Sequence, residues 1–307
     1  MAKRIAALDL GTNTFHLLIA DIADNGFQVV FHEEKHVKLG EGGITEGRIT
    51  EAAFERGLEA MRRFRSLINT YGADQVRTAG TAALRSAANG PMFIDKVEEE
   101  TGITIRLIEG ELEAALIYEG VKHAVPLKDS ALIIDIGGGS VEFIFCSEQQ
   151  IFWKKSYPVG AARLMAMFHH SDPIDEGDVN KLQAYLKDQL AELKEINEQY
   201  KPKMLVGSAG AFETFAALSE NKPFPAELPV KGYNFDKKNI RDILAALIAS
   251  THAEREKNTL ITAVRTDMIV VASVLTSYIL DELSPESVAM SVFSLKEGLL
   301  FSETREQ

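Results

Sequence analysis

The stretch DLGTNTFHLLI, residues 9–19, is matched without gaps by DIGGGSVEFIF, residues 135–145. In each copy an apolar run ends in an aspartate, a short turn of small residues follows, and a second apolar run begins. This pattern predicts two β-hairpins whose turns fall at equivalent places, Gly11 to Thr14 and Gly137 to Ser140. Two matching hairpins, each opening its own half of the chain, predict a duplicated domain.

Both turns consist of residues that can hold a phosphate. Glycine and asparagine tolerate positive φ angles, so successive amide N–H groups can point into one concavity and bind an anion without net positive charge. Hydroxyl side chains add further donors. We therefore assign phosphate binding to eight turn residues, which are Gly11, Thr12, Asn13, Thr14, Gly137, Gly138, Gly139 and Ser140. Two ordinary hairpins with glycine turns remain the structural alternative.

Acidic residues accompany both turns. Asp9 and Asp135 end the first strand of their hairpins, and Glu142 follows Asp135 by seven residues across the second turn. Carboxylate oxygens are hard ligands, which suit Mg²⁺, with Mn²⁺ as the alternative ion, rather than zinc. The sequence therefore predicts a magnesium site beside the bound phosphate.

The remaining pattern predicts an α/β fold with domains at 1–123 and 124–307. Apolar runs predict strands at 5–10, 15–22, 27–39, 76–79, 103–108, 131–136, 141–146, 151–157, 204–206 and 287–290. Helical spacing predicts helices at 50–70, 91–100, 111–122, 161–168, 176–199, 210–218, 237–250 and 267–283. Arg85 is expected in a loop, and the proline-rich stretch 221–229 in another.

Composition narrows the class of protein. The chain has 307 residues, 46% of them hydrophobic and 25% charged, which is typical of a globular protein. Its formal net charge of −12 disfavours extensive binding to the phosphate backbone of nucleic acid but allows a small anionic substrate. The single cysteine, Cys146, cannot form a disulfide within one chain. We find no secretory leader and no apolar run of membrane-spanning length, and therefore expect a cytoplasmic protein.

Further motifs follow the first hairpin in order. They are TAGTAALR at 78–85, IEGELEA at 108–114, IDIGGGSVE at 134–142 and, more weakly, LKEGLL at 295–300. Together with ALDLGTNT at 7–14, they resemble the exopolyphosphatase and guanosine pentaphosphate phosphohydrolase (Ppx/GppA) family, within the superfamily of acetate and sugar kinases, heat-shock ATPases and actin. The resemblance covers nearly the whole chain and implies two ribonuclease H-like (actin-like) domains with a cleft between them.

The resemblance also implies roles for particular residues. Glu113 is the implied catalytic base and Arg85 the phosphate-binding arginine. Asp135 and Glu142 are the implied magnesium ligands, with Asp9 as the matching acid of the first domain. The implied activity is magnesium-dependent release of terminal phosphate from polyphosphate or pppGpp. A homodimer is a further expectation from the resemblance.

Several positions depart from the family pattern. The family usually has Thr, Arg and Arg at three positions, which here are Val141, Ala115 and Lys296. A Gly-Gly-Thr loop is replaced by residues 207–210, where we assign phosphate binding to Ser208, Ala209 and Gly210. These departures affect contacts that bind the chain and discriminate substrates, so the choice between polyphosphate and pppGpp stays open.

Two other functions remain open. A kinase or ATPase of the same superfamily would need an adenosine pocket built on the 207–210 loop. A sensor would bind polyphosphate or an alarmone with little turnover, which the departures from the family pattern keep open. The site residues also have structural alternatives, since Glu113 can serve as a first-turn acid that favours the helix dipole and Arg85 can be a surface residue or an ion-pair partner.

Overall fold

The computed structural model describes residues 3–23, 26–128, 130–223 and 231–302. The chain forms two compact units, each with its own β-sheet. The first unit comprises the chain up to Gly120 together with the segment from Ser294, and the second comprises Val121 to Phe293. The sequence-based division at residue 123 differs from this mainly in the C-terminal segment, which groups with the first unit.

The sheet of the first unit has the strand order β3-β2-β1-β4. Its strands are β1 (Lys3–Leu10), β2 (Phe15–Ala23), β3 (Gly26–Lys35) and β4 (Gln75–Gly80). The first three form an antiparallel meander, and β4 runs parallel to β1. Because side chains alternate along a strand, Leu8 and Leu10 enter the hydrophobic core, while Asp9 lies on the other face with its register partner His16.

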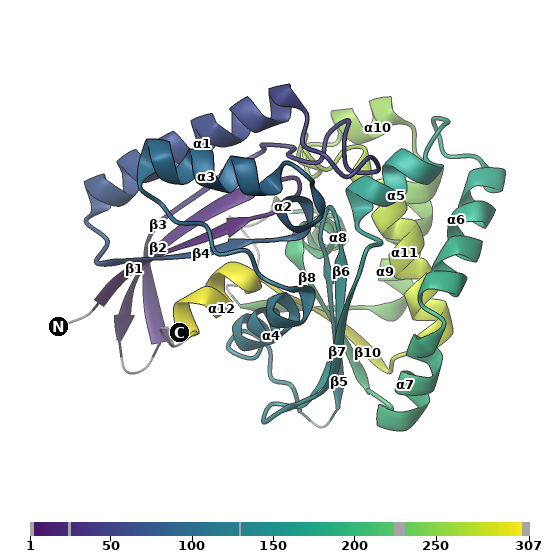
Figure 1. Cartoon of the computed structure of the whole chain (residues 1–307). Coiled ribbons are helices and arrows are strands. Elements are labelled where there is room, and N and C mark those ends of the chain that lie inside the picture. Colours follow the sequence, from purple (N-terminus) through teal and green to yellow (C-terminus); the bar gives the residue numbers. More distant parts are fainter. Residues whose placement is uncertain (1–2, 24–25, 129, 224–230, 303–307) are drawn as a thin grey trace. The chain divides into compact units, whose positions relative to one another are not determined.

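Helices pack on both faces of this sheet (Figure 1). They are α1 (Glu51–Tyr71), α2 (Ala82–Ser86), α3 (Gly90–Thr101), α4 (Gly110–Val121) and α12 (Leu295–Phe301). Thr50 caps the start of helix α1, and its side chain accepts a hydrogen bond from the amide of Ala53. It ends at Gly72, whose φ of 64° requires a left-handed conformation that favours glycine.

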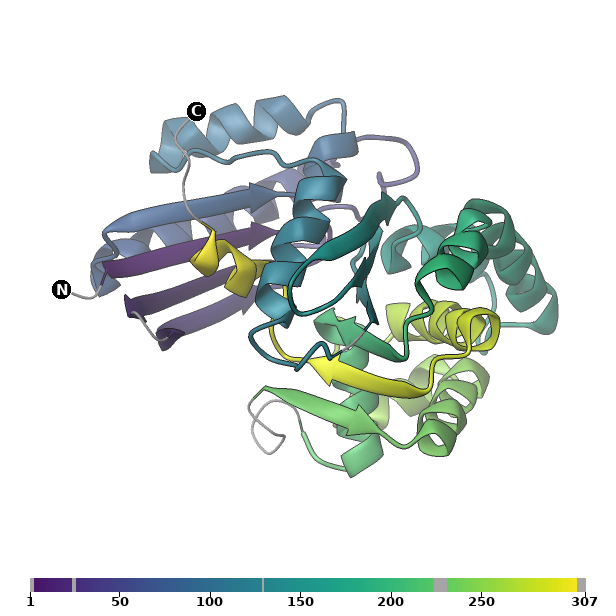
Figure 2. The ribbon, with the colours of Figure 1, turned by 90° about the horizontal axis from the view of Figure 1, so that it is seen from below.

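Helix α12 is held tightly to the first unit. A Cβ built on Gly298 would lie 1.9 Å from the carbonyl oxygen of Leu116 in α4. A Cβ on Gly120, at the end of α4, would lie 2.1 Å from the carbonyl oxygen of Ser294. Nη1 of Arg77 in β4 donates to the last carbonyl groups of α12 at 2.8 and 2.9 Å. Figure 2 shows this helix, in yellow, beside the strands of the first sheet. These contacts explain why it groups with the first unit.

Replacing Gly298 by Ala is expected to destabilise the protein by about 1–3 kcal/mol, or more, because the added methyl group forces α4 and α12 apart. Urea denaturation measures the change. The matched control is Gly177→Ala, at an exposed helical position where an added Cβ would lie 3.1 Å from Oδ1 of the Asp175 side chain. An unfolding midpoint for Gly298→Ala equal to that of the control would contradict the close packing of the two helices.

The sheet of the second unit has the strand order β7-β6-β5-β8-β10-β9. Its strands are β5 (Ala131–Ile136), β6 (Val141–Cys146), β7 (Ile151–Tyr157), β8 (Met204–Ser208), β9 (Gly232–Phe235) and β10 (Ser287–Ser291). In its hairpin Asp135 pairs with Glu142, as Asp9 pairs with His16 in the first unit. The gapless match in the sequence is therefore confirmed as a match in strand register.

The helices of the second unit surround a core helix, α11 (Met268–Leu283), which is buried along most of its length. The others are α5 (Ala161–Phe168), α6 (Glu176–Gln189), α7 (Glu192–Tyr200), α8 (Ala209–Glu220), α9 (Lys237–Ala249) and α10 (His252–Lys257). Helix α11 packs against α5, α6 and α9. Within the described ranges, no helix is long and apolar enough to cross a membrane.

Some predicted elements differ from the structure. The strand expected at 103–108 is wrong, since only a single parallel bridge joins Leu107 to Gly80. The single helix expected at 176–199 is two helices, α6 and α7, broken after Gln189. Arg85 lies in the short helix α2 rather than in a loop. Strand β3 ends at Lys35, four residues before its predicted end. The predicted loop at 221–229 lies partly outside the described residues.

Candidate functional site

In the turn of the first hairpin, the carbonyl groups are hydrogen-bonded to neighbouring backbone, whereas most of the amide groups are not. The amide of Gly11 closes the turn by donating to the carbonyl oxygen of Thr14 at 3.1 Å. The carbonyl oxygens of Thr12 and Asn13 accept hydrogen bonds from Gly40 and Lys38 at 3.0 and 2.8 Å. Within the described part of the chain, the amides of residues 12–14 have no backbone acceptor. Three consecutive amides of this kind can donate hydrogen bonds to one anion.

The turn of the second hairpin has the same construction. The amide of Gly137 donates to the carbonyl oxygen of Ser140 at 3.0 Å. The carbonyl oxygens of residues 137–139 accept from the amides of residues 160–162, at 2.9 to 3.3 Å, where α5 begins. As far as the structure describes the chain, the amides of residues 138–140 have no backbone acceptor. The sequence match thus predicts a shared backbone pattern as well as shared residue types.

Gly160 supports the second turn and was not predicted as a site residue. A Cβ on Gly160 would lie 2.4 Å from the carbonyl carbon of Gly139 and 2.5 Å from the carbonyl group of Gly138. Only glycine lets the start of α5 approach the turn this closely. The sequence signal was weak, because a glycine before a predicted helix is common.

Replacing Gly160 by Ala is expected to lower kcat/KM for phosphate release by about 10²-fold, because the methyl group displaces the turn and misaligns its amides. Steady-state kinetics with a polyphosphate substrate measure the change, and circular dichroism checks the fold. Gly177→Ala in the same unit serves as the control. Unchanged kinetics for Gly160→Ala would remove the second turn from the site.

The acids of the second hairpin lie side by side and are almost fully buried. Asp135 and Glu142 are cross-strand partners with 7% and 1% exposure. Oγ of Ser208 donates to Oδ2 of Asp135 at 2.5 Å, and Oγ of Ser156 donates to Oε1 of Glu142 at 2.6 Å. Burial of two neighbouring carboxylates is costly unless a cation compensates them. The pair therefore suits a divalent ion.

Asp135 and Glu142 offer two carboxylates, a donor set that suits Mg²⁺. Among the described residues, no group of three or more His, Cys, Asp or Glu side chains is placed to hold a metal. Mg²⁺ usually takes one or two carboxylates and completes its shell with water and substrate phosphate. Asp135 and Glu142 match that pattern. Asp9, the corresponding acid of the first unit, is half-buried beside the first turn.

The first unit brings together the predicted base and the predicted phosphate-binding arginine. Glu113 lies in the first turn of α4 and is 6% exposed. Nη1 of Arg85 donates to Oε2 of Glu113 at 3.0 Å and to the carbonyl oxygen of Ile108 at 2.8 Å. Arg85 therefore forms an ion pair with Glu113, which was one of the structural alternatives for this arginine. The pair fixes the carboxylate of Glu113 in one orientation and compensates its burial.

In the 207–210 loop, the groups expected to bind phosphate are engaged or covered by other parts of the second unit. The hydroxyl of Ser208 is fully buried and points to Asp135, so it positions that acid. Ala209 has a φ of 65°, which is rare for a residue with a Cβ. A Cβ on Gly207 would lie 2.1 Å from the ring of Phe212, and one on Gly210 would lie 2.4 Å from the guanidinium of Arg265. Side chains thus cover both glycines of the loop.

Two of the departures from the family pattern have a clear place in the structure. Val141 is fully buried in the core of the second unit, on the face of β6 opposite to Glu142. A hydroxyl at this position would therefore lie on the core side of β6, away from Asp135 and Glu142. Nζ of Lys296 lies 3.3 Å from Oε1 of its neighbour Glu297. Burial raises the pKa of Glu297.

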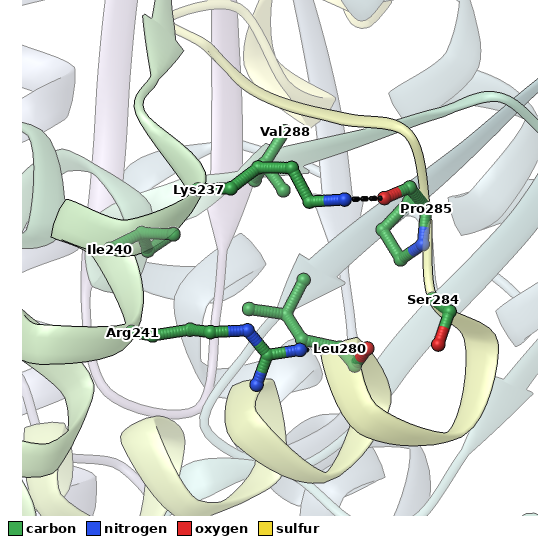
Figure 3. A pocket seen from close by; sticks show the side chains of 7 residues that line it. All are labelled: Lys237, Ile240, Arg241, Leu280, Ser284, Pro285 and Val288. Carbon is green, nitrogen blue, oxygen red and sulfur yellow. Dashed lines mark hydrogen bonds between the residues drawn. The ribbon is translucent and has the colours of Figure 1, made fainter.

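A pocket elsewhere in the second unit does not belong to this site (Figure 3). It lies where β10 begins, at the end of the parallel strands opposite to Asp135, and its volume is about 70 Å³. A volume of this size holds a few water molecules rather than a substrate. Its lining residues are Lys237, Ile240, Arg241, Leu280, Ser284, Pro285 and Val288.

Known proteins resemble this chain along most of its length. The sequence profile of the Ppx/GppA phosphatase family matches residues 18–307. The crystal structure of an exopolyphosphatase from Cytophaga hutchinsonii has a TM-score of 0.93 and 36% identity, with 97% of each chain covered. This likeness confirms the predicted α/β, actin-like fold.

Two curated relatives are longer than this chain. A bifunctional 3-dehydroquinate synthase/phosphatase of Fusobacterium nucleatum is 29% identical over 298 residues, which cover 93% of this chain and 44% of that protein. A guanosine-5'-triphosphate,3'-diphosphate pyrophosphatase of Aeromonas hydrophila is 27% identical over 301 residues, which cover 96% of this chain and 58% of that protein. The chain thus spans about half the length of these relatives. The family profile and the exopolyphosphatase structure together show that the chain belongs to the Ppx/GppA phosphatase family.

Proposed function

We propose that the chain is a phosphoanhydride hydrolase that releases terminal phosphate from inorganic polyphosphate or pppGpp. The observation that carries the proposal is the pair of matching turns, each with three consecutive amides that lack a backbone acceptor in the described chain. Such amides bind phosphate oxygens without adding charged side chains. The names of the relatives, which denote hydrolases of exopolyphosphatase and pyrophosphatase type, support the same reading.

In this proposal the residues have separate tasks. The turn amides bind the terminal phosphate, and Arg85 adds a positive charge to the site. Glu113 accepts a proton from a water molecule whose oxygen forms the new bond to phosphorus, while the bond to the bridging oxygen breaks and the shortened chain leaves. Magnesium, held by Asp135 and Glu142 when bound, would neutralise charge on the phosphate oxygens.

The alternatives have less support. A kinase or ATPase needs access to the 207–210 loop for adenosine, and side chains of Phe212 and Arg265 cover the two glycines there. The sensor hypothesis drew support from Val141, which packs in the core away from the acids. A shared site formed by both units, a homodimer and a cytoplasmic location stay predictions.

A phosphate-release panel tests the proposal. The substrates are polyphosphates of several lengths, pppGpp, ATP and pyrophosphate, each with and without Mg²⁺. We expect phosphate from polyphosphate or pppGpp only in the presence of the metal. ATP-dependent transfer to an acceptor without polyphosphate hydrolysis would favour a kinase, and tight binding without release would favour a sensor.

A further inference from the structure

The two hydroxyl groups of the first turn have different surroundings. That of Thr12 is buried and has no hydrogen-bond partner among the described residues. Oγ1 of Thr14 lies 3.4 Å from Nδ1 of His36, the residue that follows β3. The two side chains meet because β2 and β3 pair up to Phe15 and Lys35, and Thr14 and His36 come next on each side. Thr14 therefore has a neighbour whose charge can change with pH.

The backbone around His36 is held in place. The amide of Lys38 donates to the carbonyl oxygen of Asn13 in the same turn at 2.8 Å. Val37 lies in the hydrophobic core, and Nε of Arg56 in α1 donates to its carbonyl oxygen at 2.8 Å. The side chain of His36 is 41% exposed. His36 thus has a fixed place beside the turn, with a ring that solvent can protonate.

The charged groups near this ring come from several elements. Oε1 of Glu34 in β3 lies 3.9 Å from Nε2 of His36, and Oε2 of the same carboxylate lies 3.8 Å from Nδ1 of His16 in β2. Further charged and titratable groups lie on β3, on β1, in the loop after β3 and on α1, and they are His32, Asp9, Lys38, Glu41 and Arg56. Glu34 thus lies next to the ring nitrogen that does not face Thr14.

The state of the His36 ring determines where the hydroxyl proton of Thr14 points. A hydroxyl group has one proton to donate and two lone pairs to accept with. The negative charge of Glu34 favours the proton of a neutral ring on Nε2, so that Nδ1 accepts a hydrogen bond from Thr14. In a protonated ring Nδ1–H donates to Oγ1 of Thr14 instead. The hydroxyl proton is then free to donate to a phosphate oxygen.

We propose that His36 is a positioning residue that turns the hydroxyl proton of Thr14 toward bound phosphate when its ring is protonated. The inference rests on the proposed function and adds a pH-dependent contact to the first turn. The protonated ring also brings a positive charge close to three amides that lack a backbone acceptor in the described chain. Binding of an anion favours the protonated ring, so binding takes up protons and weakens as the pH rises.

Isothermal titration calorimetry with sulfate tests the inference without depending on catalysis. Sulfate is tetrahedral like phosphate, and its charge stays constant across the range of about pH 5.5–8 in which imidazoles titrate. We expect the Kd for sulfate to rise about five- to tenfold over this range, the effect of one hydrogen bond lost together with one charge. Titrations in buffers of different ionisation enthalpy should show an uptake of about half a proton for a tenfold effect.

Two variants separate the ring from the hydroxyl. His36→Asn places a neutral amide where Nδ1 lies, so sulfate affinity should lose its dependence on pH and the proton uptake should disappear. Thr14→Val keeps the shape of the side chain but removes the hydroxyl, so sulfate should bind more weakly at low pH. Replacing His36 in the Thr14→Val background should then have a smaller effect than in the wild type, because the two side chains are coupled.

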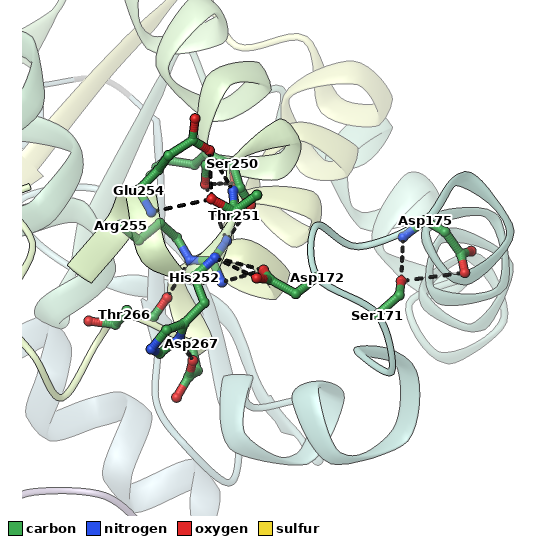
Figure 4. A network of polar contacts seen from close by, with 11 residues as sticks. Ser171, Asp172, Asp175, Ser250, Thr251, His252, Glu254, Arg255, Thr266 and Asp267 are labelled. Atoms are coloured by element: carbon green, nitrogen blue, oxygen red, sulfur yellow. Dashed lines mark hydrogen bonds and ion pairs between the residues drawn. The ribbon is translucent and has the colours of Figure 1, made fainter. Parts of the chain in front are cut away.

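The control is another histidine whose Nδ1 contacts a neighbouring side chain. Nδ1 of His252 lies 2.7 Å from Oδ1 of Asp267, within a polar network of the second unit that includes Arg255 and Asp172 (Figure 4). A carboxylate only accepts, so Nδ1 donates in either state of this ring and no hydroxyl is redirected. His252→Asn keeps a donor for Asp267 and should retain the wild-type dependence of sulfate binding on pH.

Three results would overturn the inference. The first is a sulfate affinity that still falls with rising pH in His36→Asn, which would assign the titration to another group. The second is an equal effect of His36→Asn with and without the Thr14 hydroxyl, which would leave charge alone as its cause. The third is a wild type that does not bind sulfate at any pH. A wild type that releases no phosphate but shows the proton uptake would contradict the proposed hydrolase and support the role of His36.

Discussion

Replacing Glu113 by Gln is expected to lower kcat for phosphate release by about 10³-fold while leaving the fold intact. General bases contribute about 10²–10⁴-fold to the rates of reactions of this kind, and an amide cannot accept the proton of water. Gln keeps an oxygen that can accept the hydrogen bond from Nη1 of Arg85, now at 3.0 Å. The substitution therefore removes the base with little change in packing. Steady-state phosphate release with saturating polyphosphate measures kcat.

The matched control is Glu111→Gln, two residues earlier in the same helical turn. Glu111 is exposed, whereas Glu113 is 6% exposed, so the control removes the same charge from the same end of α4. If first-turn acids act only through the helix dipole, both variants should lose similar, small amounts of stability and neither should lose activity. That outcome would exclude Glu113 as the base. Loss of activity only at position 113 supports the proposal.

The hairpins were predictable because the residue pattern that forms each strand and turn also determines how the two strands pair. An apolar strand, a turn of small residues and a second strand allow few registers, since a one-residue slip would turn every core side chain outward. The sequence match aligned Asp9 with Asp135 and His16 with Glu142. In the structure Asp9 is the register partner of His16, and Asp135 is the register partner of Glu142. The turn residues expected to bind phosphate in the second hairpin followed from this alignment, whereas the magnesium-ligand roles of Asp135 and Glu142 were implied by the family resemblance.

Other features could not be predicted because they depend on tertiary contacts. The apolar run at 103–108 reads as a strand, yet it forms only one bridge to Gly80. Helix α12 follows the second unit in sequence but packs on the first, through Gly298 and Gly120. The hydroxyl of Ser208 reads as a phosphate ligand, whereas it donates to Asp135 across neighbouring strands. In each case local sequence carries no information about the distant partner.

Replacing Asp135 by Asn is expected to lower the activity without lowering the melting temperature. Asn is isosteric and can still accept the hydrogen bond from Ser208, while it removes one of two buried neighbouring carboxylates. Without metal, the loss of a like charge beside Glu142 should leave the melting temperature unchanged or raise it. With metal, kcat/KM should fall by about 10²-fold or more, because a neutral amide is a poor ligand for Mg²⁺.

A magnesium titration of activity distinguishes a metal ligand from a residue that only shapes the site. For Asp135→Asn the Mg²⁺ concentration that gives half-maximal activity should rise, and the same shift is expected for Glu142→Gln. Glu148→Gln, an exposed position in the turn after β6, removes an acid of the same unit and should keep the wild-type midpoint. Lower activity at an unchanged midpoint would mean that Asp135 is not a ligand. The paired hairpin would then bind phosphate without holding the ion.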